Sequence, residues 1–325
     1  MGGGDPLFLW LIVLAADGLF AALPGLRAVL AAPLALIDRL IDWFDARLNR
    51  EKRSSASRTL RGALVVLVLA LAAWVAGVVL AGLARGLPGG WLIEAVVLVC
   101  LIYQRRLIAQ ARQVAESLAA GDLSAARNAL APMAGFETGT EDEFAIARGT
   151  VEAAATRFND GVVAAAFWYF LLGLPGLCAW RTINVAAARI GRATPRLAAF
   201  GQFAARLNDV LGFVPGIISG AVLSLASVFV PSASPARAFA GWFGALHPRH
   251  VLGNRVCRGP MAGALGLTLS APRPRLDGTA DEGWVGDGRA RVTTRDVGRA
   301  LFLLVVACLI AAALIAGLVM ARVLA

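Results

Sequence analysis

The feature that most constrains the fold is an uncharged apolar run at residues 62–84, GALVVLVLALAAWVAGVVLAGLA. A helix of this length can cross a hydrocarbon core of about 30 Å. Twelve of its residues are Leu or Val, and each of these favours insertion by about 0.3–0.6 kcal/mol near the bilayer centre. We therefore predict that this run is a transmembrane helix.

The composition extends this prediction to the whole chain. Hydrophobic residues make up 58% and charged residues only 16% of the 325 residues, with a mean hydropathy of +0.71, which exceeds what a soluble domain normally carries. The apolar runs are distributed from end to end, and no internal repeat is visible. We predict an all-α integral membrane protein with one domain over 1–325 and about four to six membrane helices or re-entrant segments, joined by cytoplasmic helical loops.

Other apolar runs supply the remaining membrane segments. Three are predicted to span the bilayer: 7–23, 91–103 and 301–321. In the first, Asp17 is charged and would cost about 2.5–3.5 kcal/mol at the bilayer centre. Two more runs, 162–180 and 213–230, contain breaks with Gly and Pro. We predict that they are re-entrant or membrane-associated, and the alternative is that they are ordinary spans.

The segments 104–161 and 231–300 are predicted to be polar loops, with a short helical hairpin at 104–131 that breaks at Gly121-Asp122. The runs 62–84 and 91–103 are predicted to pair as a hairpin through the turn at 85–90.

The charge distribution indicates the orientation and the class of partner. The formal net charge is +10, almost all of it from arginines between the apolar runs, because Lys52 is the only lysine. Dispersed arginines are typical of cytoplasmic loops beside an anionic leaflet, so we predict that the loop 24–61 is cytoplasmic in a multi-pass protein of a bacterial inner membrane. The pattern lacks the basic face with interleaved aromatic residues that nucleic acid requires. The lipid bilayer is the predicted partner, and no protein partner is indicated.

Several chemical classes lack their sequence motifs. GxxxxGK[ST], GxSxG and HExxH are absent, which leaves P-loop, serine-hydrolase and zinc-protease functions without support. His247 and His250 flank Pro248 with no cysteine or carboxylate nearby, and the four cysteines form no CxxC pair. We therefore predict no metal ligand set.

The stretch from Arg148 to Pro215 carries single polar residues between apolar ones. Glu152, Asn159 and Asp160 fall at i, i+7 and i+8, which predicts one side of a helix that begins near Ala145. Further along, Arg206 and Asp209 share a helix face at i and i+3. Isolated polar residues in a strongly apolar sequence indicate a functional site at the membrane face. The alternatives are that Arg206 and Asp209 form only a local ion pair and that Glu152 is simply exposed to solvent.

The order of the motifs indicates a family. The chain contains RGTVE, then FNDGVVAAAFWYFLLGLPG, WRTINVAAARIGR and FGQFAARLNDVLGFVPGI, followed by HPxxxxGN at 247–254, MAGALGLTL and GWVGDGRARVTTRDVGRAL. This order resembles the CobD/CbiB family of cobalamin biosynthesis, the membrane-bound adenosylcobinamide-phosphate synthases. The resemblance covers most of the chain.

The resemblance implies a ligase. Such an enzyme forms an amide between the free propionate of adenosylcobyric acid and an aminopropanol or its phosphate, with ATP and Mg²⁺, so the implied partners are a corrinoid and aminopropanol phosphate. The residues that it marks as catalytic are Glu152, Asp160 and Asp209. Those that it marks as substrate-binding are Arg148, Asn184, Arg206, Asn254 and Thr138.

Some family positions are replaced. The segment after Asn184 reads Val-Ala-Ala-Ala-Arg189 where the family carries hydroxyls and a carboxylate, and Asn208 replaces an aspartate. The alternative function is therefore a non-catalytic membrane scaffold or sensor of the same fold, similar to AmpE-like proteins. A small transporter is less favoured, because the chain has no paired discontinuous helices in corresponding halves.

Overall fold

The structure is a computed structural model, and it describes residues 6–19, 24–102, 104–191, 194, 196–246, 255–270 and 283–324. Apart from two isolated β-bridges, the regular structure of these residues is helical, so the predicted all-α class is confirmed. Four helical stretches are long and apolar enough to span a membrane: Ser55–Gly86, Glu143–Ile190, Gln202–Phe229 and Thr294–Ala321. The chain is an α-helical membrane protein.

The chain divides into two compact units, each made of separate segments. Unit 1 contains Met1–Ile102, Ala164–Leu211 and Ala312–Ala325, and unit 2 contains Tyr103–Val163 and Gly212–Ala311. The helices of unit 1 are α1 (Pro6–Leu19), α2 (Pro24–Leu48), α3 (Ser55–Gly86), α4 (Trp91–Leu101), α8 (Ala164–Ile190), the first part of α9 (Gln202–Ala226) and the last part of α12 (Thr294–Leu324).

Helices α3 and α4 form the helical hairpin that the sequence predicts for 62–84 and 91–103. The turn between them is closed by the Gly90 N–H, which donates to the Leu87 carbonyl at 3.0 Å, and Gly89 has a φ of 77°, which glycine adopts without steric cost. One apolar cluster of unit 1 includes Trp10 stacked on Tyr169, with 5.7 Å between the ring centroids. Whether these helices span the bilayer as predicted stays a topology prediction.

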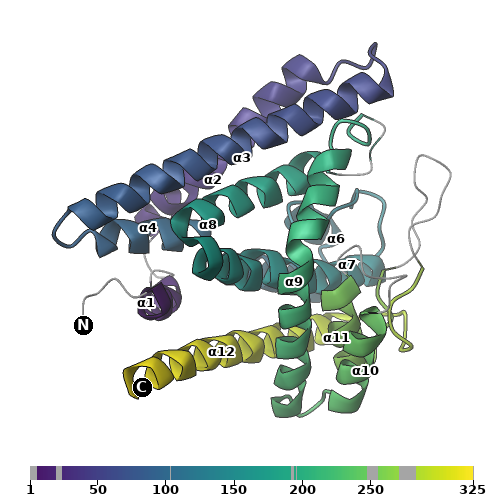
Figure 1. Cartoon of the computed structure of the whole chain (residues 1–325). Helices are drawn as coiled ribbons and strands as arrows, with labels where there is room; N and C mark the ends of the chain where they lie inside the picture. The colour runs from purple at the N-terminus through teal and green to yellow at the C-terminus, as the bar shows by residue number, and fades with distance from the viewer. Residues whose placement is uncertain are drawn as a thin grey trace. The chain divides into compact units, whose positions relative to one another are not determined.

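Helix α8 consists of two arms that meet at Gly173. This glycine has φ 68° and ψ −159°, a backbone conformation open essentially only to glycine, and Pro175 follows it. Figure 1 shows α8 bent along its length and lying beside α3. Contact is close, because a Cβ on Gly77 would lie 2.6 Å from the Cα of Pro175. The re-entrant topology of 162–180 stays a prediction.

The segment 24–61, predicted to be a cytoplasmic loop, is helical over residues 24–48, which form α2. Its side of the membrane stays a prediction. Its apolar residues Leu34, Ile41 and Leu48 recur at a spacing of seven, which places them on one side of a helix, and Leu34 and Ile41 are buried. Asp17 belongs to α1, but its side chain lies outside the described part of the structure.

Unit 2 contains the helices on which most of the predicted site residues lie. They are α5 (Gln104–Ala119), α6 (Leu123–Leu130), α7 (Glu143–Phe158), the π-helical turn η2 (Asn159–Val163), the rest of α9, the 3₁₀ turn η3 (Ser227–Phe229), α10 (Pro235–Ala245), α11 (Arg255–Leu265) and the first part of α12 (Thr294–Leu324). The segments 104–161 and 231–300, predicted as polar loops, contain α5, α6 and α7 in the first and α10, α11 and the start of α12 in the second. That they lie outside the membrane stays a prediction.

Side-chain caps start the helices of the 104–161 segment. The predicted break at Gly121-Asp122 is confirmed: Gly121 has a φ of 75°, and Asp122 accepts the Ala125 N–H at 2.8 Å at the start of α6. Asp142 likewise accepts the Ala145 N–H at 2.7 Å, so α7 begins two residues before the predicted start. These caps satisfy amides that a helix leaves without partners.

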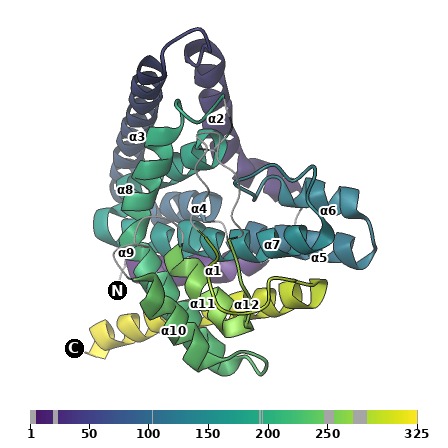
Figure 2. The same cartoon turned by 90° about the vertical axis from the view of Figure 1, so that its right-hand side faces the viewer.

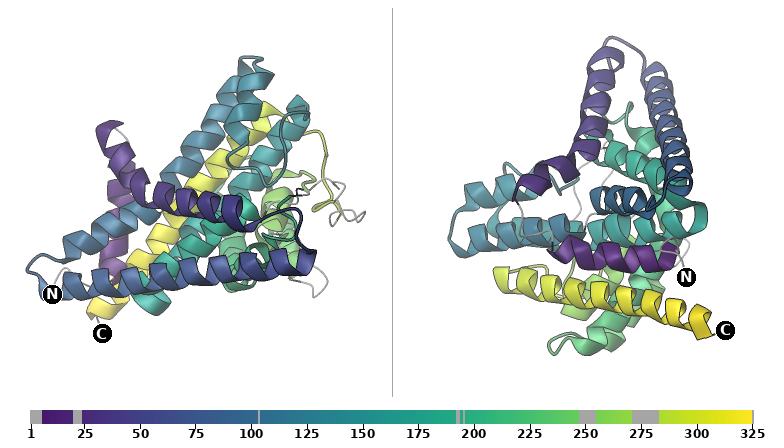
Figure 3. Two further views of the ribbon diagram at one scale, coloured as in Figure 1. Left: turned by 90° about the horizontal axis from the view of Figure 1, so that it is seen from above. Right: turned by 90° about the vertical axis from the view of Figure 1, so that its left-hand side faces the viewer.

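Small residues allow α7, α10 and α11 to approach their neighbours closely. Helix α7 packs against α5, α6 and α11, and Figures 2 and 3 show the α5–α6 hairpin beside α7. Helices α10 and α11 lie side by side in Figure 2. A Cβ on Gly241 of α10 would lie 2.3 Å from the Gly259 carbonyl oxygen of α11, so only glycine permits this approach.

We predict that Gly77→Ala destabilises the protein, whereas Gly82→Ala on the same helix does not. The added methyl group would overlap Pro175 in the first variant and meet nothing within 4 Å in the second. Overpacking typically costs about 1–3 kcal/mol, while alanine is the better helix former at an open position. Thermal unfolding of the purified variants in detergent measures this, and equal midpoints would contradict the α3–α8 contact.

Candidate functional site

Glu152 of α7 is a buried carboxylate with a defined partner. Its side chain is 3% exposed, and its Oε1 accepts the backbone N–H of Ser270 at 2.6 Å. Ser270 has a φ of 57° and is the only non-glycine residue with positive φ in the described part of the chain. Such a conformation costs about 1–3 kcal/mol and persists only where the surroundings hold it. The Glu152 carboxylate is one of the groups that hold it.

Arg258 of α11 links the same two segments through its side chain. Its Nη1 donates to the Ser270 Oγ at 3.1 Å, and its Nε donates to the Thr156 Oγ1 at 3.3 Å. Thr156 lies four residues after Glu152, on the same face of α7. Glu152, Ser270, Arg258 and Thr156 therefore form a chain of polar contacts that joins α7, α11 and the segment that follows α11.

Backbone bridges position Ser270 from the other side. Leu269 and Val285 exchange N–H···O bonds of 2.8 and 2.9 Å, and the Thr268 N–H donates to the Arg289 carbonyl at 3.0 Å. Residues 266–270 and 285–289 thus form a short ribbon, which we call the 266–289 ribbon. The side chain of Arg289 extends from it and donates to the Oδ1 of Asp296 at 2.5 Å.

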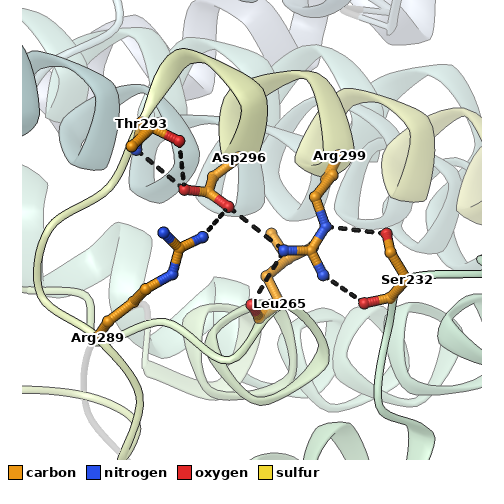
Figure 4. Close-up of polar contacts among 6 residues, drawn as sticks. All are labelled: Ser232, Leu265, Arg289, Thr293, Asp296 and Arg299. Atoms are coloured by element: carbon orange, nitrogen blue, oxygen red, sulfur yellow. Dashed lines mark hydrogen bonds and ion pairs between the residues drawn. The ribbon is translucent and has the colours of Figure 1, made fainter.

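Asp296 anchors this ribbon to the start of α12. The carboxylate is 1% exposed and accepts the Thr293 N–H at 3.0 Å and the Thr293 hydroxyl at 2.8 Å. Figure 4 shows Arg289 and Arg299 approaching it, with Arg299 continuing to Ser232. A buried carboxylate with this many donors is well satisfied, so the ribbon that carries Ser270 has a fixed base.

Asn159 and Asp160 lie in the π-helical turn η2 that continues α7. Asn159 is 2% exposed; its amide nitrogen donates to Asp160 Oδ1 at 3.3 Å and to the Gly212 carbonyl at 3.4 Å. Its Oδ1 is buried and accepts no hydrogen bond. Single π-turns occur frequently at functional sites, and a buried oxygen without a donor points to a missing partner.

Cys257 of α11 faces this turn. Burial raises the pKa of its thiol to about 12, and the negative charge of Asp160 adds to this, while Ser219 and Arg258 act in the opposite sense. A thiol with this pKa stays protonated at neutral pH and is a poor nucleophile. A Cβ on Gly216 would lie 3.9 Å from the Cys257 sulfur. Cys257 therefore shapes the wall of the site and does not act as a nucleophile.

The structure places the other predicted residues of unit 2 as follows. Arg148 is half-buried; its Nη1 donates to the Ala290 carbonyl at 3.0 Å, and its guanidinium lies 5.3 Å from the ring centroid of Trp284. The Thr138 hydroxyl donates to the Arg127 carbonyl at 3.1 Å, which gives it a local structural contact. The predicted residue Asn254, with His247 and His250, lies outside the described residues.

Of the predicted residues of unit 1, Asn184 belongs to a separate polar chain with Arg181 and Asn208. Arg181 Nη1 donates to Asn184 Oδ1 at 2.8 Å, and Asn184 Nδ2 donates to Asn208 Oδ1 at 3.0 Å. All three side chains are buried. On the same helix as Asn208, Arg206 is exposed and Asp209 is half-buried.

Arg189, where the Asn184 segment departs from the family pattern, has partners in α2. It pairs with Asp38 at 3.4 Å and with Asp42, and all three side chains are substantially exposed. Exposed ion pairs contribute about 0–1 kcal/mol. Arg189 therefore joins α8 to α2 at the surface of unit 1.

The sequence did not reveal four members of these two clusters: Arg258, Ser270, Arg181 and Asn208. Thr156 was detectable, because a hydroxyl four residues after Glu152 shares its helix face. Arg258 was harder to predict from the sequence than Thr156, because its only distinguishing feature is that it is a charged residue within a Gly- and Ala-rich stretch. Ser270 carried none, because its role depends on backbone conformation.

Comparisons with known proteins add to this geometry. A family model described as CobD/Cbib protein matches residues 11–304. Cobalamin biosynthesis protein CobD of Sinorhizobium sp is 32% identical over 320 residues, covering 98% of this chain and 94% of that protein. The protein of the same name from Sinorhizobium fredii (strain NBRC 101917 / NGR234) is 33% identical over 318 residues and 97% of each chain. That from Klebsiella pneumoniae is 31% identical over 291 residues, 88% of this chain and 90% of that protein. No solved structure matches.

We predict that Glu152→Ala destabilises unit 2 more than Glu152→Gln does. Alanine leaves the Ser270 amide and its neighbours without an acceptor, a loss of about 1–3 kcal/mol, whereas the glutamine carbonyl can still accept the Ser270 N–H. Hydrogen exchange of residues 268–270 and thermal unfolding measure the difference. Equal protection in wild type and Glu152→Ala would show that this hydrogen bond does not hold the ribbon.

Proposed function

Because this chain belongs to the CobD/CbiB family of cobalamin biosynthesis, we propose that it is a membrane-bound ligase. It joins an aminopropanol, or its phosphate, to the free propionate of adenosylcobyric acid by an amide bond. The product is adenosylcobinamide or its phosphate. The location that we propose is the inner membrane of a bacterium, which agrees with the four membrane-compatible helices.

The observation that carries this proposal is the pair of buried carboxylates along α7 and η2. When the amine nitrogen forms the C–N bond it loses a proton, and a carboxylate within reach can accept it. One oxygen of Glu152 already holds the Ser270 N–H. Asp160 lies in a π-turn beside an amide oxygen without a donor. We therefore assign the proton acceptor to Asp160 and a positioning role to Glu152.

The residues around Asp160 fit a magnesium ion that arrives with a nucleotide better than one held by the protein alone. Within the described residues, no group of three or more His, Cys, Asp or Glu side chains converges. Mg²⁺ usually takes one or two protein carboxylates and completes its shell with water and phosphate oxygens. The buried Asn159 Oδ1 would supply a protein ligand, and Asp160 keeps its role as the proton acceptor. When bound, ATP and Mg²⁺ would supply the energy that activates the propionate carboxyl group.

Arg148 is a predicted substrate-binding residue that has donor capacity left. Its Nη1 is engaged with Ala290, but its Nε is buried and makes no hydrogen bond. A guanidinium presents its donors in a planar fork that matches a carboxylate or phosphate. Contact of its face with Trp284 fixes the plane of this fork. We propose that it binds an anionic group of a substrate.

The polar chain of unit 1 favours the alternative function. Asn184 uses its carbonyl for Arg181 and its amide for Asn208, and Arg189 pairs with α2. These contacts give the altered Asn184 segment a structural role. A protein in which that segment only supports the fold would act as a non-catalytic scaffold or sensor in the membrane.

Complementation separates the two functions. We expect the full-length chain to restore cobalamin formation from cobyric acid in a bacterium that lacks its cobinamide-phosphate synthase. Asp160→Asn should lower the rate of cobinamide formation by roughly 10²–10⁴-fold, because the proton acceptor is lost. Glu116→Gln, which alters an exposed carboxylate of α5, is the matched control and should keep the wild-type rate.

One result would count against the ligase, and another would count only against the role of Asp160. No growth with the protein present in the membrane would favour the scaffold or sensor. Growth at the wild-type rate with Asp160→Asn would leave the ligase in place but remove Asp160 as the proton acceptor. Membrane fractions blotted for the protein distinguish both results from failed expression.

A further inference from the structure

A concentration of basic residues lies where α3, the longest helix of unit 1, begins. Between residues 47 and 61 the sequence contains six basic residues and one carboxylate, that of Glu51, so the formal charge of this segment is +5. The segment includes the end of α2, the connection at 49–54 and the start of α3. We call it the basic segment. The proposed reaction makes no use of its charge.

Hydrogen bonds hold the backbone of the basic segment in place. Arg58 Nε donates to the Asn49 Oδ1 at 2.8 Å, and Arg58 Nη2 donates to the Arg196 carbonyl. The Thr59 hydroxyl donates to the Ala199 carbonyl at 3.0 Å. Arg58 is therefore a structural residue, and the other basic side chains extend from a fixed framework.

The carboxylates nearest in sequence already have partners. The three aspartates in the C-terminal half of α2 pair with Arg189 and Arg196. Within the part of the chain that the structure describes, four side chains of the basic segment form no ion pair: Arg50, Lys52, Arg53 and Arg61. The basic segment therefore carries positive charge that no described carboxylate neutralises.

Arg53 lies among these unpaired charges. Its side chain is half-buried, and its Nη1 is enclosed by protein without a hydrogen-bond partner. Partial burial and the positive charges of Arg61 and Arg50 lower the pKa of its guanidinium, which still remains charged at neutral pH. Like charges held close together are unfavourable. An anion bound between these three arginines would relieve their repulsion and accept their unused donors.

An exposed apolar stripe on α3 begins at Arg61. Its members follow Arg61 at spacings of 3, 7, 10, 14 and 18 residues, which places them on one helix face. Each is more than half exposed, and we call the set the α3 stripe: Leu64, Val68, Leu71, Val75 and Val79. At 1.5 Å per residue it extends about 27 Å from Arg61, close to the thickness of the hydrocarbon core.

Trp43 of α2 marks the level of the membrane surface beside the basic segment. Its ring is half-exposed, and the guanidinium of Arg47 lies 4.5 Å from the ring centroid. Tryptophan is enriched where the hydrocarbon core meets the headgroups. The basic segment therefore has the composition of a headgroup-level surface, with the α3 stripe extending from it into the hydrocarbon core.

We propose that the basic segment and the α3 stripe together bind a phospholipid with an anionic headgroup. Arg50, Arg53 and Arg61 pair with the phosphate, and an acyl chain lies along the α3 stripe. A soluble phosphate ester would need the arginines alone, whereas a lipid uses the charge and the apolar face that meet at Arg61. The bound lipid would hold the connection between α2 and α3 at the membrane surface. This inference is independent of the proposed reaction.

The test is native mass spectrometry of the full-length protein, released from a neutral detergent after titration with three ligands. Palmitoyl-oleoyl phosphatidylglycerol is anionic, palmitoyl-oleoyl phosphatidylcholine has the same chains without net charge, and glycerol 3-phosphate has no chains. We expect phosphatidylglycerol to bind at least about tenfold more tightly than either of the others. Each basic residue near an anionic headgroup contributes roughly a factor of five. Arg53→Gln should therefore weaken binding about fivefold, and the cluster variant Arg50→Gln/Arg53→Gln/Arg61→Gln roughly 100-fold.

A second triple variant is the matched control. Arg85→Gln/Arg112→Gln/Arg295→Gln removes the same charge from three exposed arginines that lie far apart in the sequence, and it should bind phosphatidylglycerol as wild type does. Without lipid, neither triple variant should unfold at a lower temperature than wild type, because none of the six side chains has a hydrogen bond or ion pair with a described residue. Added phosphatidylglycerol should raise the thermal midpoint of the control but not that of the cluster variant.

Three results would overturn the proposal. Unchanged affinity for phosphatidylglycerol in the cluster variant would remove the arginines from the site. An equal loss of affinity in both triple variants would show that only the total charge matters. Arginine-dependent binding of glycerol 3-phosphate as tight as that of phosphatidylglycerol would identify a site for a soluble phosphate ester in place of a lipid.

Discussion

The structure of unit 2 depends on the cost of burying a charge. A carboxylate removed from water is destabilising unless donors surround it. Glu152 and Asp296 are both nearly inaccessible. Glu152 accepts from Ser270, 118 positions away, whereas the donors to Asp296 lie within seven positions of it. The hydrogen bond from the Ser270 N–H to Glu152 holds one end of the 266–289 ribbon. The hydrogen bond from Arg289 to Asp296 holds the other end. The ribbon is therefore held between two carboxylates, and the turn at 286–288 is held with it.

Helix breakers are the second determinant of local geometry. Gly173 interrupts α8 through a backbone conformation that other residues avoid, and the π-turn at 159–163 adds a residue to the helical ladder after α7. The first allows the C-terminal arm of α8 to pack along α3. The second places two polar side chains, Asn159 and Asp160, in a buried position. The close helix packing therefore occurs next to the interruption at Gly173, and the buried polar contacts occur in the π-turn.

Local patterns in the sequence predicted much of the fold. The all-α class, the α3–α4 hairpin and the break at Gly121-Asp122 depend on hydropathy, run length and turn residues within short windows. The helical character of 24–48 was missed, because its arginines and aspartates resemble a loop until the spacing of Leu34, Ile41 and Leu48 is considered. The site was predicted only in part. Glu152 and Asp160 were identified by their helical spacing, but their partners come from other elements, and no local pattern encodes which arginine or amide meets which carboxylate.

The separation of Glu152 and Ser270 by 118 positions has a consequence for biogenesis. During translation the ribosome delivers α7 well before the residues that satisfy its carboxylate. For that interval Glu152 must remain hydrated, be protonated or be held by the insertion machinery, since lipid offers it no donor. Unit 2 also draws on both sides of unit 1 along the chain, so truncations before residue 270 would leave an acidic helix without its partners. Such nascent fragments are natural substrates for membrane quality-control proteases.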